Sequence, residues 1–547
     1  MLPVTPEQHA MLFPKLNDMH IVEMRRRGIV RQTIRSEILF DRETQRPGIF
    51  IVLSGSIAIV GVASGEEAEL SVLGPGEFTG ELTQLTGRRS LVSCRVVDAG
   101  EVLEVSRDSL RLIMQTDAVI GDIFLGAFVR RRTYLIANAV GDAVLIGSVH
   151  SSDTLRLRSF LGRNGHPYTY LDVDRDPDLQ AMLDHLSIRV EEIPVLVCRG
   201  KTVLRSPSNA EAAACFDLNE GVDQTEVFDV LIVGAGPGGL AAAVYGASEG
   251  LDVLVLESDA PGGQAGSSSR IENYLGFPLG VSGQDLANRA LVQAEKFGAK
   301  LSVARSAISL ECLDLPYRVR VDDGKVLQGR TVIVATGSRY RGLGIEDADR
   351  FNGKGVYYGA TQLEAAMCSD EEVAIVGGGN SAGQAAVFLS SFAKHVHLFV
   401  RGPSLSSTMS KYLIARIEAS NKISLRTNTI IQALEGETDL EKIHWRQSLT
   451  GQISSDNIHH LFIMTGVDPN TRWLAGCLAL DNRDFVRTGA DVMDSWTLKR
   501  SPFPLETSAP GIFAVGDVRS GSIKRVASAV GEGSMAIQFV HLVLAAQ

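Results

Sequence analysis

The most regular pattern of hydrophobic and polar positions lies in the middle of the chain, over residues 228–257. Residues 230–233 are all apolar, and a glycine-rich turn follows them. An alanine-rich stretch then leads to a second apolar run, 253–256, and to Glu257. Short apolar runs bounded by turns indicate buried strands, and the alanine-rich stretch between them indicates a helix. The pattern therefore predicts a strand, a turn, a helix and a second strand.

The turn has the residue spacing that phosphate binding requires. Gly234 permits a tight turn, Gly236 lets backbone N–H groups approach a pyrophosphate, and Gly239 lets the helix pack closely on the strand. Glu257 stands where a carboxylate accepts hydrogen bonds from a ribose diol. An ordinary strand–turn–helix unit in a core is the alternative. The unit predicts a dinucleotide site made by Gly234, Gly236, Pro237, Gly238, Gly239 and Glu257.

A second unit of the same kind follows. Apolar residues 373–376 lead into a glycine turn, and a helix to about residue 392 and a strand over 395–400 come next. Arg401 ends that strand, where a guanidinium suits a 2′-phosphate and favours NADPH over NADH; a solvated surface charge is the alternative. Two units predict one tightly held flavin and one exchangeable nicotinamide. The second site comprises Gly377, Gly379, Asn380, Ser381, Ala382 and Arg401.

Two further segments suit a bound cofactor. A buried strand ends at Thr336 and Gly337, where a glycine turn would pass close to a ligand. Near the C-terminus an apolar strand ends in Gly516 and Asp517, and the carboxylate suits a ribityl hydroxyl. Arg525 precedes a final helix.

Together these motifs, over residues 226–547, resemble the thioredoxin reductase family of flavoproteins. The resemblance implies an α/β fold with two Rossmann-like dinucleotide-binding domains, FAD and NADPH (NADH possible) as cofactors, and a homodimer. It also implies that the nicotinamide domain rotates on linkers near 341–351 and 466–470. In the family, Gly263, Gln264 and Asn273 would line the isoalloxazine, Asp517 would bind the ribitol, and Arg525, Val526 and Ala527 would lie by the ring.

One departure from the family pattern affects the chemistry. The family's redox C-x-x-C lies just before the second fingerprint, and an ungapped comparison places Ala360 and Leu363 there. Without sulfur, reduced FAD has no internal disulfide to reduce, so electrons must leave the flavin directly. The acceptor would be a quinone, an iron–sulfur or flavodoxin-type carrier, or oxygen. Cys368, a few residues on, is either structural or a single redox thiol.

These features predict an NAD(P)H-dependent FAD oxidoreductase in which the flavin carries the chemistry, so no acid–base residue is nominated. Two alternatives stay open. One is a thioredoxin-disulfide reductase, as the family resemblance implies. The other is a regulatory flavoprotein that senses a cyclic nucleotide or redox state without turnover.

The N-terminal segment shows a different pattern. Short apolar runs at 49–53, 56–62, 68–73, 91–96 and 102–105 alternate with turns and predict an antiparallel barrel or jelly roll, followed by a helix over 108–132. A glycine turn, an acid and an arginine could hold a cyclic phosphodiester. The segment resembles the cyclic nucleotide-binding domain, whose ligand residues would be Gly80, Glu81, Leu82, Arg89 and Ser90; a docking module is the alternative.

The next segment alternates strands and helices. Strands are expected at 143–148, 168–173 and 195–198, helices at 155–164 and 177–186, and a hairpin closing at 201–205. The order resembles a thioredoxin or glutaredoxin domain, with Pro194 either the family's cis proline or a plain turn proline. Residues 150–154 take the place of the family's cysteines and contain no sulfur. The segment is therefore predicted inert in disulfide exchange and suited to docking or transmission.

Length and composition suggest domain boundaries and argue against some classes of partner. The chain has 547 residues, and we expect domains at 1–139, 140–222, 226–350, 353–465 and 466–547. The net charge of −11 gives no support to nucleic acid or an anionic membrane as a partner. No secretory signal is recognised, so a cytoplasmic location is expected. The six cysteines form no C-x-x-C pair or metal site and are expected mostly as small buried hydrophobes in a reducing compartment.

Overall fold

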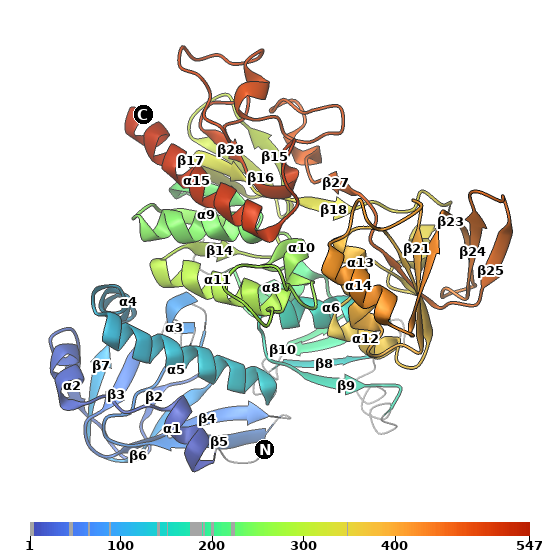
Figure 1. Cartoon of the computed structure of the whole chain (residues 1–547). Coiled ribbons are helices and arrows are strands. Elements are labelled where there is room, and N and C mark those ends of the chain that lie inside the picture. The colour runs from blue at the N-terminus through green and yellow to red at the C-terminus, as the bar shows by residue number, and fades with distance from the viewer. Residues whose placement is uncertain are drawn as a thin grey trace.

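The computed structural model describes residues 5–42, 48–63, 66–81, 83–86, 89–138, 143–149, 151–175, 189, 192–198, 202–219, 225–346 and 348–547. Figure 1 shows the N-terminal sheets in blue at the lower left and two larger α/β units above and to the right. A small teal sheet lies beneath these two units. The predicted helix over 177–186, Leu82 and the expected boundary residues 139, 140 and 222 fall outside the described residues.

Two antiparallel sheets form the N-terminal unit, with strand orders β1-β7-β3 and β2-β6-β4-β5. Inward-facing apolar side chains fill the space between them, which confirms the predicted jelly roll. The strands are β1 (Ile29–Gln32), β2 (Ile38–Phe40), β3 (Ile49–Val52), β4 (Ser56–Ala63), β5 (Glu66–Leu73), β6 (Ser93–Asp98) and β7 (Glu101–Val105). The helices are α1 (Pro6–Leu12), α2 (Asp18–Arg25), α3 (Thr83–Thr86), α4 (Arg107–Thr116) and α5 (Ala118–Ala137).

The single helix expected over 108–132 is two helices, so that prediction is wrong. Asp117 separates them, because its carboxylate accepts hydrogen bonds at 3.0 Å from the backbone N–H groups of Val119 and Ile120. This side chain satisfies two of the amide groups that the start of a helix leaves unpaired. Helix α5 therefore begins in a new direction and lies along the jelly roll.

The second unit is a four-stranded sheet of order β11-β10-β8-β9, with β9 parallel and β10 antiparallel to β8. The Ile193–Pro194 bond is cis, as expected from the thioredoxin resemblance. Its elements are β8 (Ala143–Gly147), α6 (Ser152–Arg163), β9 (Thr169–Asp172), β10 (Val195–Cys198), β11 (Thr202–Arg205) and α8 (Asn209–Cys215).

The third unit contains the first glycine turn. Its sheet has the order β14-β13-β12-β17-β16-β15, and β28 pairs with β17, so the chain returns to this sheet near its C-terminus. Its strands are β12 (Val227–Val233), β13 (Val253–Leu256), β14 (Lys300–Ser302), β15 (Ala307–Glu311), β16 (Tyr317–Val321), β17 (Val326–Val334) and β28 (Ile512–Ala514). Its helices are α9 (Pro237–Ser248), α10 (Gly263–Gly266), α11 (Gly283–Phe297), η5 (Gly516–Val518) and α15 (Val526–Ala546).

The fourth unit contains the second glycine turn in a parallel sheet of order β19-β26-β20-β21-β22. A short antiparallel pair, β18 (Ser338–Tyr340) and β27 (Val467–Pro469), connects it to the third unit close to both expected linkers. Its parallel strands are β19 (Val356–Tyr357), β20 (Glu372–Val376), β21 (His395–Val400), β22 (Ile423–Thr427) and β26 (His460–Ile463). The other elements of this unit are α12 (Gln362–Met367), α13 (Asn380–Leu389), α14 (Lys411–Ala419), β23 (Thr429–Glu435), β24 (Lys442–Gln447), β25 (Ile453–Asp456) and η2 (Ala348–Phe351). The short helices η3 (Arg472–Leu474) and η4 (Gly489–Val492) belong to the third unit.

Within the described residues, helix α15 is long and apolar enough to cross a membrane by length and composition alone. Its packing gives another reason for that composition. A Cβ atom on Gly533 would lie 2.1 Å from the carbonyl oxygen of Gly238, so α15 lies directly against α9. Ile537 and Val540 are fully buried in the same core.

The expectation that the cysteines are mostly unpaired small hydrophobes is wrong for four of the six. Disulfides join Cys198 to Cys215 and Cys312 to Cys477, whereas Cys94 and Cys368 are free and buried. The second pair closes a loop with a sequence separation of 165 residues and joins the end of β15 to the segment after η3. The sequence alone does not show that thiols so far apart in the chain form a disulfide.

We predict that the purified, oxidised protein shows two free thiols when it is titrated in denaturant without reductant. Replacing both residues of the long-range pair, Cys312→Ser and Cys477→Ser, should lower the free energy of unfolding by about 2–5 kcal/mol, because the disulfide restricts the unfolded chain. Denaturant unfolding of the wild type and of the double variant measures the difference. Six reactive thiols, or equal stabilities, would contradict the pairing.

Candidate functional site

The first glycine turn forms a cradle at the end of β12. A Cβ atom on Gly234 would lie 2.3 Å from the carbonyl oxygen of Ala335, and one on Gly239 would lie 1.9 Å from the carbonyl oxygen of Gly234. Only glycine fits at both positions. Gly236 is the N-cap of α9, and Pro237 is at its start, so the first N–H groups of the helix are free to bind an anion.

Glu257 is held against this cradle. One carboxylate oxygen accepts a hydrogen bond from the backbone N–H of Ala235 at 2.7 Å, and the other accepts one from Asp259 at 3.0 Å. Burial raises the pKa of Glu257, while these two N–H donors and the nearby Arg163 oppose that rise. The Ser258 hydroxyl also donates to the oxygen that Asp259 binds, at 3.3 Å. A carboxylate has about four acceptor positions, so the oxygen bonded to Ala235 keeps capacity for a ribose hydroxyl.

A cavity of about 950 Å³ extends from this cradle along the third unit. It is near the upper end of the roughly 300–1,000 Å³ found for small-molecule and cofactor sites. Residues that were expected to bind cofactor line it from segments far apart in sequence: Gly234, Gly236, Pro237, Gly238, Glu257, Gly263, Gln264, Asn273, Thr336, Gly337, Gly516, Asp517, Arg525, Val526 and Ala527. The glycine cradle and this cavity together fit an extended dinucleotide such as FAD.

The far end of the cavity carries an acid and a cation. Burial raises the pKa of Asp517, and the charge of Lys524 partly offsets this. The Lys524 ammonium donates a hydrogen bond to the Asp517 backbone oxygen at 2.5 Å, which leaves the carboxylate free of that contact. The contact of Asp517 with a ribityl hydroxyl stays a prediction.

The second cradle repeats the geometry of the first. A Cβ atom on Gly377 would lie 2.3 Å from the carbonyl oxygen of Met464, and Gly379 is the N-cap of α13. The backbone N–H of Ser410 donates to the Asn380 side-chain oxygen at 2.8 Å and fixes the start of the helix. Ala382 is buried beneath the turn, and Arg401 follows β21 as an exposed side chain.

The first turns of α13, which follow the second cradle, border the same cavity as the first cradle. Asn380, Ser381 and Gln384, from the first turns of α13, line the flavin-sized cavity of the third unit. A dinucleotide bound at α13 would therefore lie beside one bound at α9. This is the arrangement that electron transfer between the two requires.

Sulfur does not line this cavity. All six cysteines lie in the described part of the chain, and none is among the residues that form its wall. Ala360 is buried in an apolar core with Ala365 and Cys368. Burial raises the pKa of the Cys368 thiol to about 12, and its Sγ donates to the Glu364 carbonyl oxygen at 3.0 Å. Cys368 is therefore in the environment of a structural cysteine, not a reactive one.

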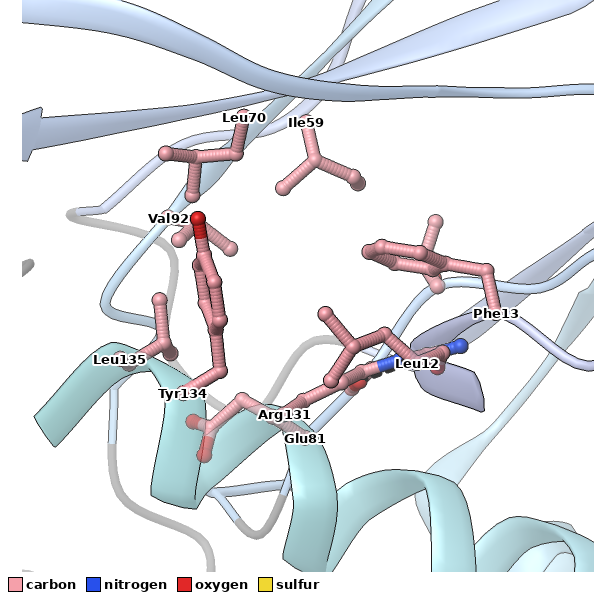
Figure 2. A pocket seen from close by; sticks show the side chains of 11 residues that line it. Leu12, Phe13, Ile59, Leu70, Glu81, Val92, Arg131, Tyr134 and Leu135 are labelled. Carbon is pink, nitrogen blue, oxygen red and sulfur yellow. Dashed lines mark hydrogen bonds between the residues drawn. The ribbon is translucent and has the colours of Figure 1, made fainter. Parts of the chain in front are cut away.

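The N-terminal ligand residues are only partly brought together. Gly80 and Glu81 line a cavity of about 40 Å³ inside the jelly roll, shown in Figure 2. Arg89 and Ser90 do not line it in this structure, and their role in ligand binding stays a prediction. The Arg89 Nε pairs with Asp217 of the second unit at 2.9 Å, and the Ser90 hydroxyl donates to the Val92 carbonyl at 2.8 Å.

Helix α5 is the reason that this cavity is small. Arg131, Tyr134 and Leu135 project from α5 into the jelly roll. The Arg131 guanidinium donates to the backbone oxygens of Leu12 and Gly80 at 2.8 and 2.6 Å, and burial lowers its pKa to about 9. The remaining space is far below the roughly 300 Å³ at which ordinary ligand pockets begin.

Sequence reasoning missed two groups of residues at these sites. Arg131 carries no motif, because its role follows from the direction of α5. Arg163, Arg305, Arg472 and Trp473 line the large cavity although no glycine fingerprint includes them. Arg163 comes from the second unit, so only the packing of that unit on the third reveals it.

Comparisons with known proteins find matches both for the part of the chain with the glycine cradles and for the N-terminal jelly roll. Residues 228–533 match the family model for pyridine nucleotide-disulphide oxidoreductases, and residues 31–117 match the cyclic nucleotide-binding domain. The chain is 34% identical to a thioredoxin reductase of Streptomyces clavuligerus over 323 residues, which are 59% of this chain and 95% of the relative. A thioredoxin reductase of Mycolicibacterium smegmatis is 32% identical over 57% of this chain and 94% of its own.

A solved structure agrees in fold. The thioredoxin reductase of Lactococcus lactis, in its FR conformation, has a TM-score of 0.53 and 26% identity, and the match covers 58% of this chain and all of that one. The match is therefore confined to a little over half of the present chain.

We predict that Gly239→Ala removes bound flavin, because the added Cβ would force α9 away from the cradle. Overpacking of this kind costs about 1–3 kcal/mol, so the free energy of unfolding should also fall. Gly531→Ala is the matched control: it also lies in a helix of the third unit, nothing lies within 4 Å of its added Cβ, and the change should be neutral or stabilising by up to about 1 kcal/mol. The ratio of flavin to protein absorbance and thermal melting measure both effects. Full flavin content in Gly239→Ala would refute the role of the cradle.

Proposed function

Because this chain belongs to the pyridine nucleotide-disulphide oxidoreductase family, we propose that it is an NADPH-dependent FAD oxidoreductase whose electron acceptor lies outside the chain. The carrying observation is that the first glycine cradle and the first turns of α13, which follow the second cradle, border one cavity whose wall contains no cysteine. FAD, when bound, would supply the two-electron chemistry between NADPH and the acceptor.

The residues of the chain bind and orient the cofactors in this proposal. The N–H groups at the start of α9 would hold the FAD pyrophosphate, Glu257 the ribose and Asp517 the ribitol. The start of α13 would hold the pyrophosphate of NADPH beside the same cavity. Gln264 is held in place because its side-chain amide donates to the Ser338 carbonyl at 2.6 Å.

The proposed activity differs from the thioredoxin reductase activity that the names of the relatives give. A thioredoxin-disulfide reductase needs a redox-active pair of thiols beside the flavin, and Ala360 and Leu363 offer none. The acceptor classes that remain are a quinone, an iron–sulfur or flavodoxin-type carrier, and oxygen. We also propose a homodimer and a cytoplasmic location, which size-exclusion chromatography and cell fractionation test.

For the N-terminal unit we propose a regulatory role, with a cyclic nucleotide as the ligand class. Its match to the cyclic nucleotide-binding domain and the position of Glu81 support this. A nucleotide would enter only if α5 moved outward and Arg89 left Asp217. Ligand binding would thus change a contact with the second unit.

We predict that the yellow protein, titrated with NADPH without oxygen, takes up two electrons per FAD and then turns over with one of the acceptor classes named above. It should not reduce thioredoxin or a disulfide reagent at a catalytic rate. Stopped-flow absorbance followed by a panel of acceptors measures this. Thioredoxin-dependent turnover would overturn the proposal, and reduction once without turnover with any acceptor would instead favour a sensor.

We predict that Arg401→Ala raises KM for NADPH about tenfold and leaves KM for NADH within about twofold, because a lost charge-assisted contact is worth about 1.4 kcal/mol or more. Lys394→Ala is the control, since this exposed cation pairs with Glu372 in the same unit. Equal effects on the two nucleotides would show that Arg401 is a surface charge without a role in cofactor choice.

A further inference from the structure

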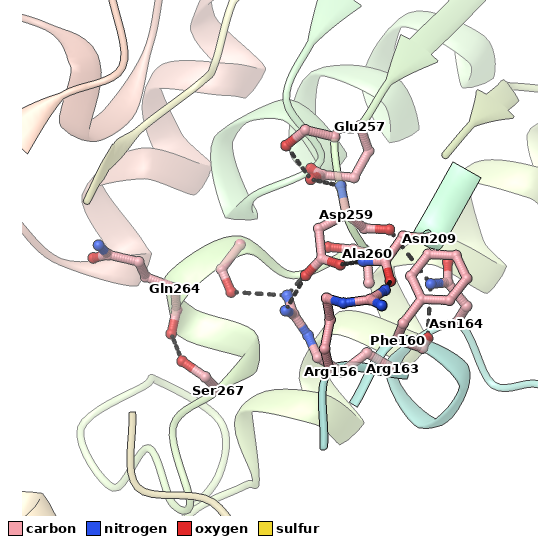
Figure 3. Close-up of polar contacts among 12 residues, drawn as sticks. Arg156, Phe160, Arg163, Asn164, Asn209, Glu257, Asp259, Ala260, Gln264 and Ser267 are labelled. Atoms are coloured by element: carbon pink, nitrogen blue, oxygen red, sulfur yellow. Dashed lines mark hydrogen bonds and ion pairs between the residues drawn. The ribbon is translucent and has the colours of Figure 1, made fainter. Parts of the chain in front are cut away.

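The second unit covers one end of the large cavity. Arg163, at the end of α6, lines that cavity together with Glu257 and Asp259 of the third unit. Figure 3 shows its guanidinium directed at the loop that follows β13. The end of the cavity that Arg163 reaches is therefore the one beside Glu257, where the adenosine half of FAD is expected.

Arg163 holds this loop through several hydrogen bonds. Its Nη1 donates to the Asp259 carboxylate at 2.7 Å, and its Nη2 donates to the backbone oxygens of Ala260 and Gly263 at 3.2 and 3.4 Å. A planar guanidinium suits such a set of acceptors, and a lysine ammonium reproduces it poorly. The loop ends at α10, whose Gly262 N-cap has a φ of 105°, a conformation that glycine adopts readily.

Other residues of the second unit support the same contact. The Asn209 amide donates to the second Asp259 oxygen at 3.0 Å, so both carboxylate oxygens bind that unit. Arg156 in turn donates to the Asn209 side-chain oxygen at 2.6 Å. Asp259 is thus fixed from two elements, α6 and the start of α8, as Figure 3 shows.

A second contact lies farther along the same end of the cavity. Asn219 exchanges two hydrogen bonds with the backbone of Val303, at 2.7 and 2.8 Å. Val303 and Ala304 are buried in one core with Phe216 and Leu218 of the second unit. The neighbouring residues 305–307 line the cavity. The two units therefore share a core at the wall of the cofactor site.

One relative matches this chain over nearly all of its own length. The Streptomyces clavuligerus enzyme aligns over 95% of its own length with 323 residues of this chain, about the length of the third and fourth units together. The segment that provides Arg163 lies outside the family match at 228–533. Arg163 thus reaches the cavity from outside the part of the chain that matches the family.

We propose that Arg163 is a positioning residue of the FAD site, and that binding of FAD and docking of the thioredoxin-like second unit stabilise each other. This inference rests on the proposed FAD site. If FAD requires the loop 258–263 in its observed conformation, Arg163 favours FAD binding by holding that loop. By thermodynamic linkage, FAD must then favour the docked second unit by the same factor.

The test measures FAD affinity by fluorescence on the full-length apoprotein, independently of turnover. Arg163→Ala should raise Kd for FAD about tenfold, which corresponds to the loss of about 1.4 kcal/mol, and Arg163→Lys should recover only part of the affinity. The matched control is Arg158→Ala: Arg158 lies on the same helix but packs over Tyr170, at 4.3 Å from the ring centroid, and should leave Kd unchanged.

Hydrogen exchange supplies the reciprocal readout. FAD added to the wild-type apoprotein should slow exchange in residues 160–166 and 209–213, and this protection should be reduced in Arg163→Lys. Wild-type affinity in Arg163→Ala, or exchange at these segments that FAD does not change, would overturn the inference. If Arg163→Ala does not fold, Arg163→Lys and the wild-type exchange decide the question. A wild-type protein that binds no FAD would instead refute the proposed function.

Discussion

The close approach of helix α9 to the end of strand β12 is the constraint on which the reductase part of the molecule depends. A side chain at Gly239 would lie within 1.9 Å of a backbone oxygen, so the helix can reach this position only without one. The approach aims the free N–H groups of α9 into the large cavity. A pyrophosphate could then be held by backbone donors and the helix dipole, with no cation required. The positions of Glu257 and of the α15 helix follow from the same packing.

The same constraint at Gly377 builds the second cradle, and the β18–β27 pair sets the two cradles against each other. In this chain the segment that would carry two cysteines is instead packed into an apolar core around Ala360. The chain thus has both glycine cradles, while Ala360 and Leu363, at the positions where the family resemblance places cysteines, carry no thiol. This separation of binding from thiol chemistry is why family membership does not by itself identify the acceptor.

The two N-terminal units form a continuous series of contacts that leads to the cofactor cavity. Arg89 of the jelly roll pairs with Asp217, and the adjacent Phe216 and Leu218 share a core with Val303 of the third unit. Beside this core, Arg163 holds the loop after β13. Such contiguity is a physical path along which a change in α5 could reach the cofactor site; coupling itself requires an element with two states. The jelly-roll cavity, filled from α5, is the place where such a change would begin.

The sequence by itself determined the features that depend on neighbouring residues. The glycine fingerprints, the acid after β13 and most strands could be predicted, because turn geometry and alternation act over a few positions. The pairing of Cys312 with Cys477, the salt bridge of Arg89 with Asp217 and the place of Arg163 in the cavity wall could not. Each depends on which surfaces meet after residues far apart in sequence have packed. Only the tertiary structure decides these contacts. Their energy comes from burial and hydrogen bonding between segments that are far apart in the chain, and neither segment's sequence shows which other segment it will contact.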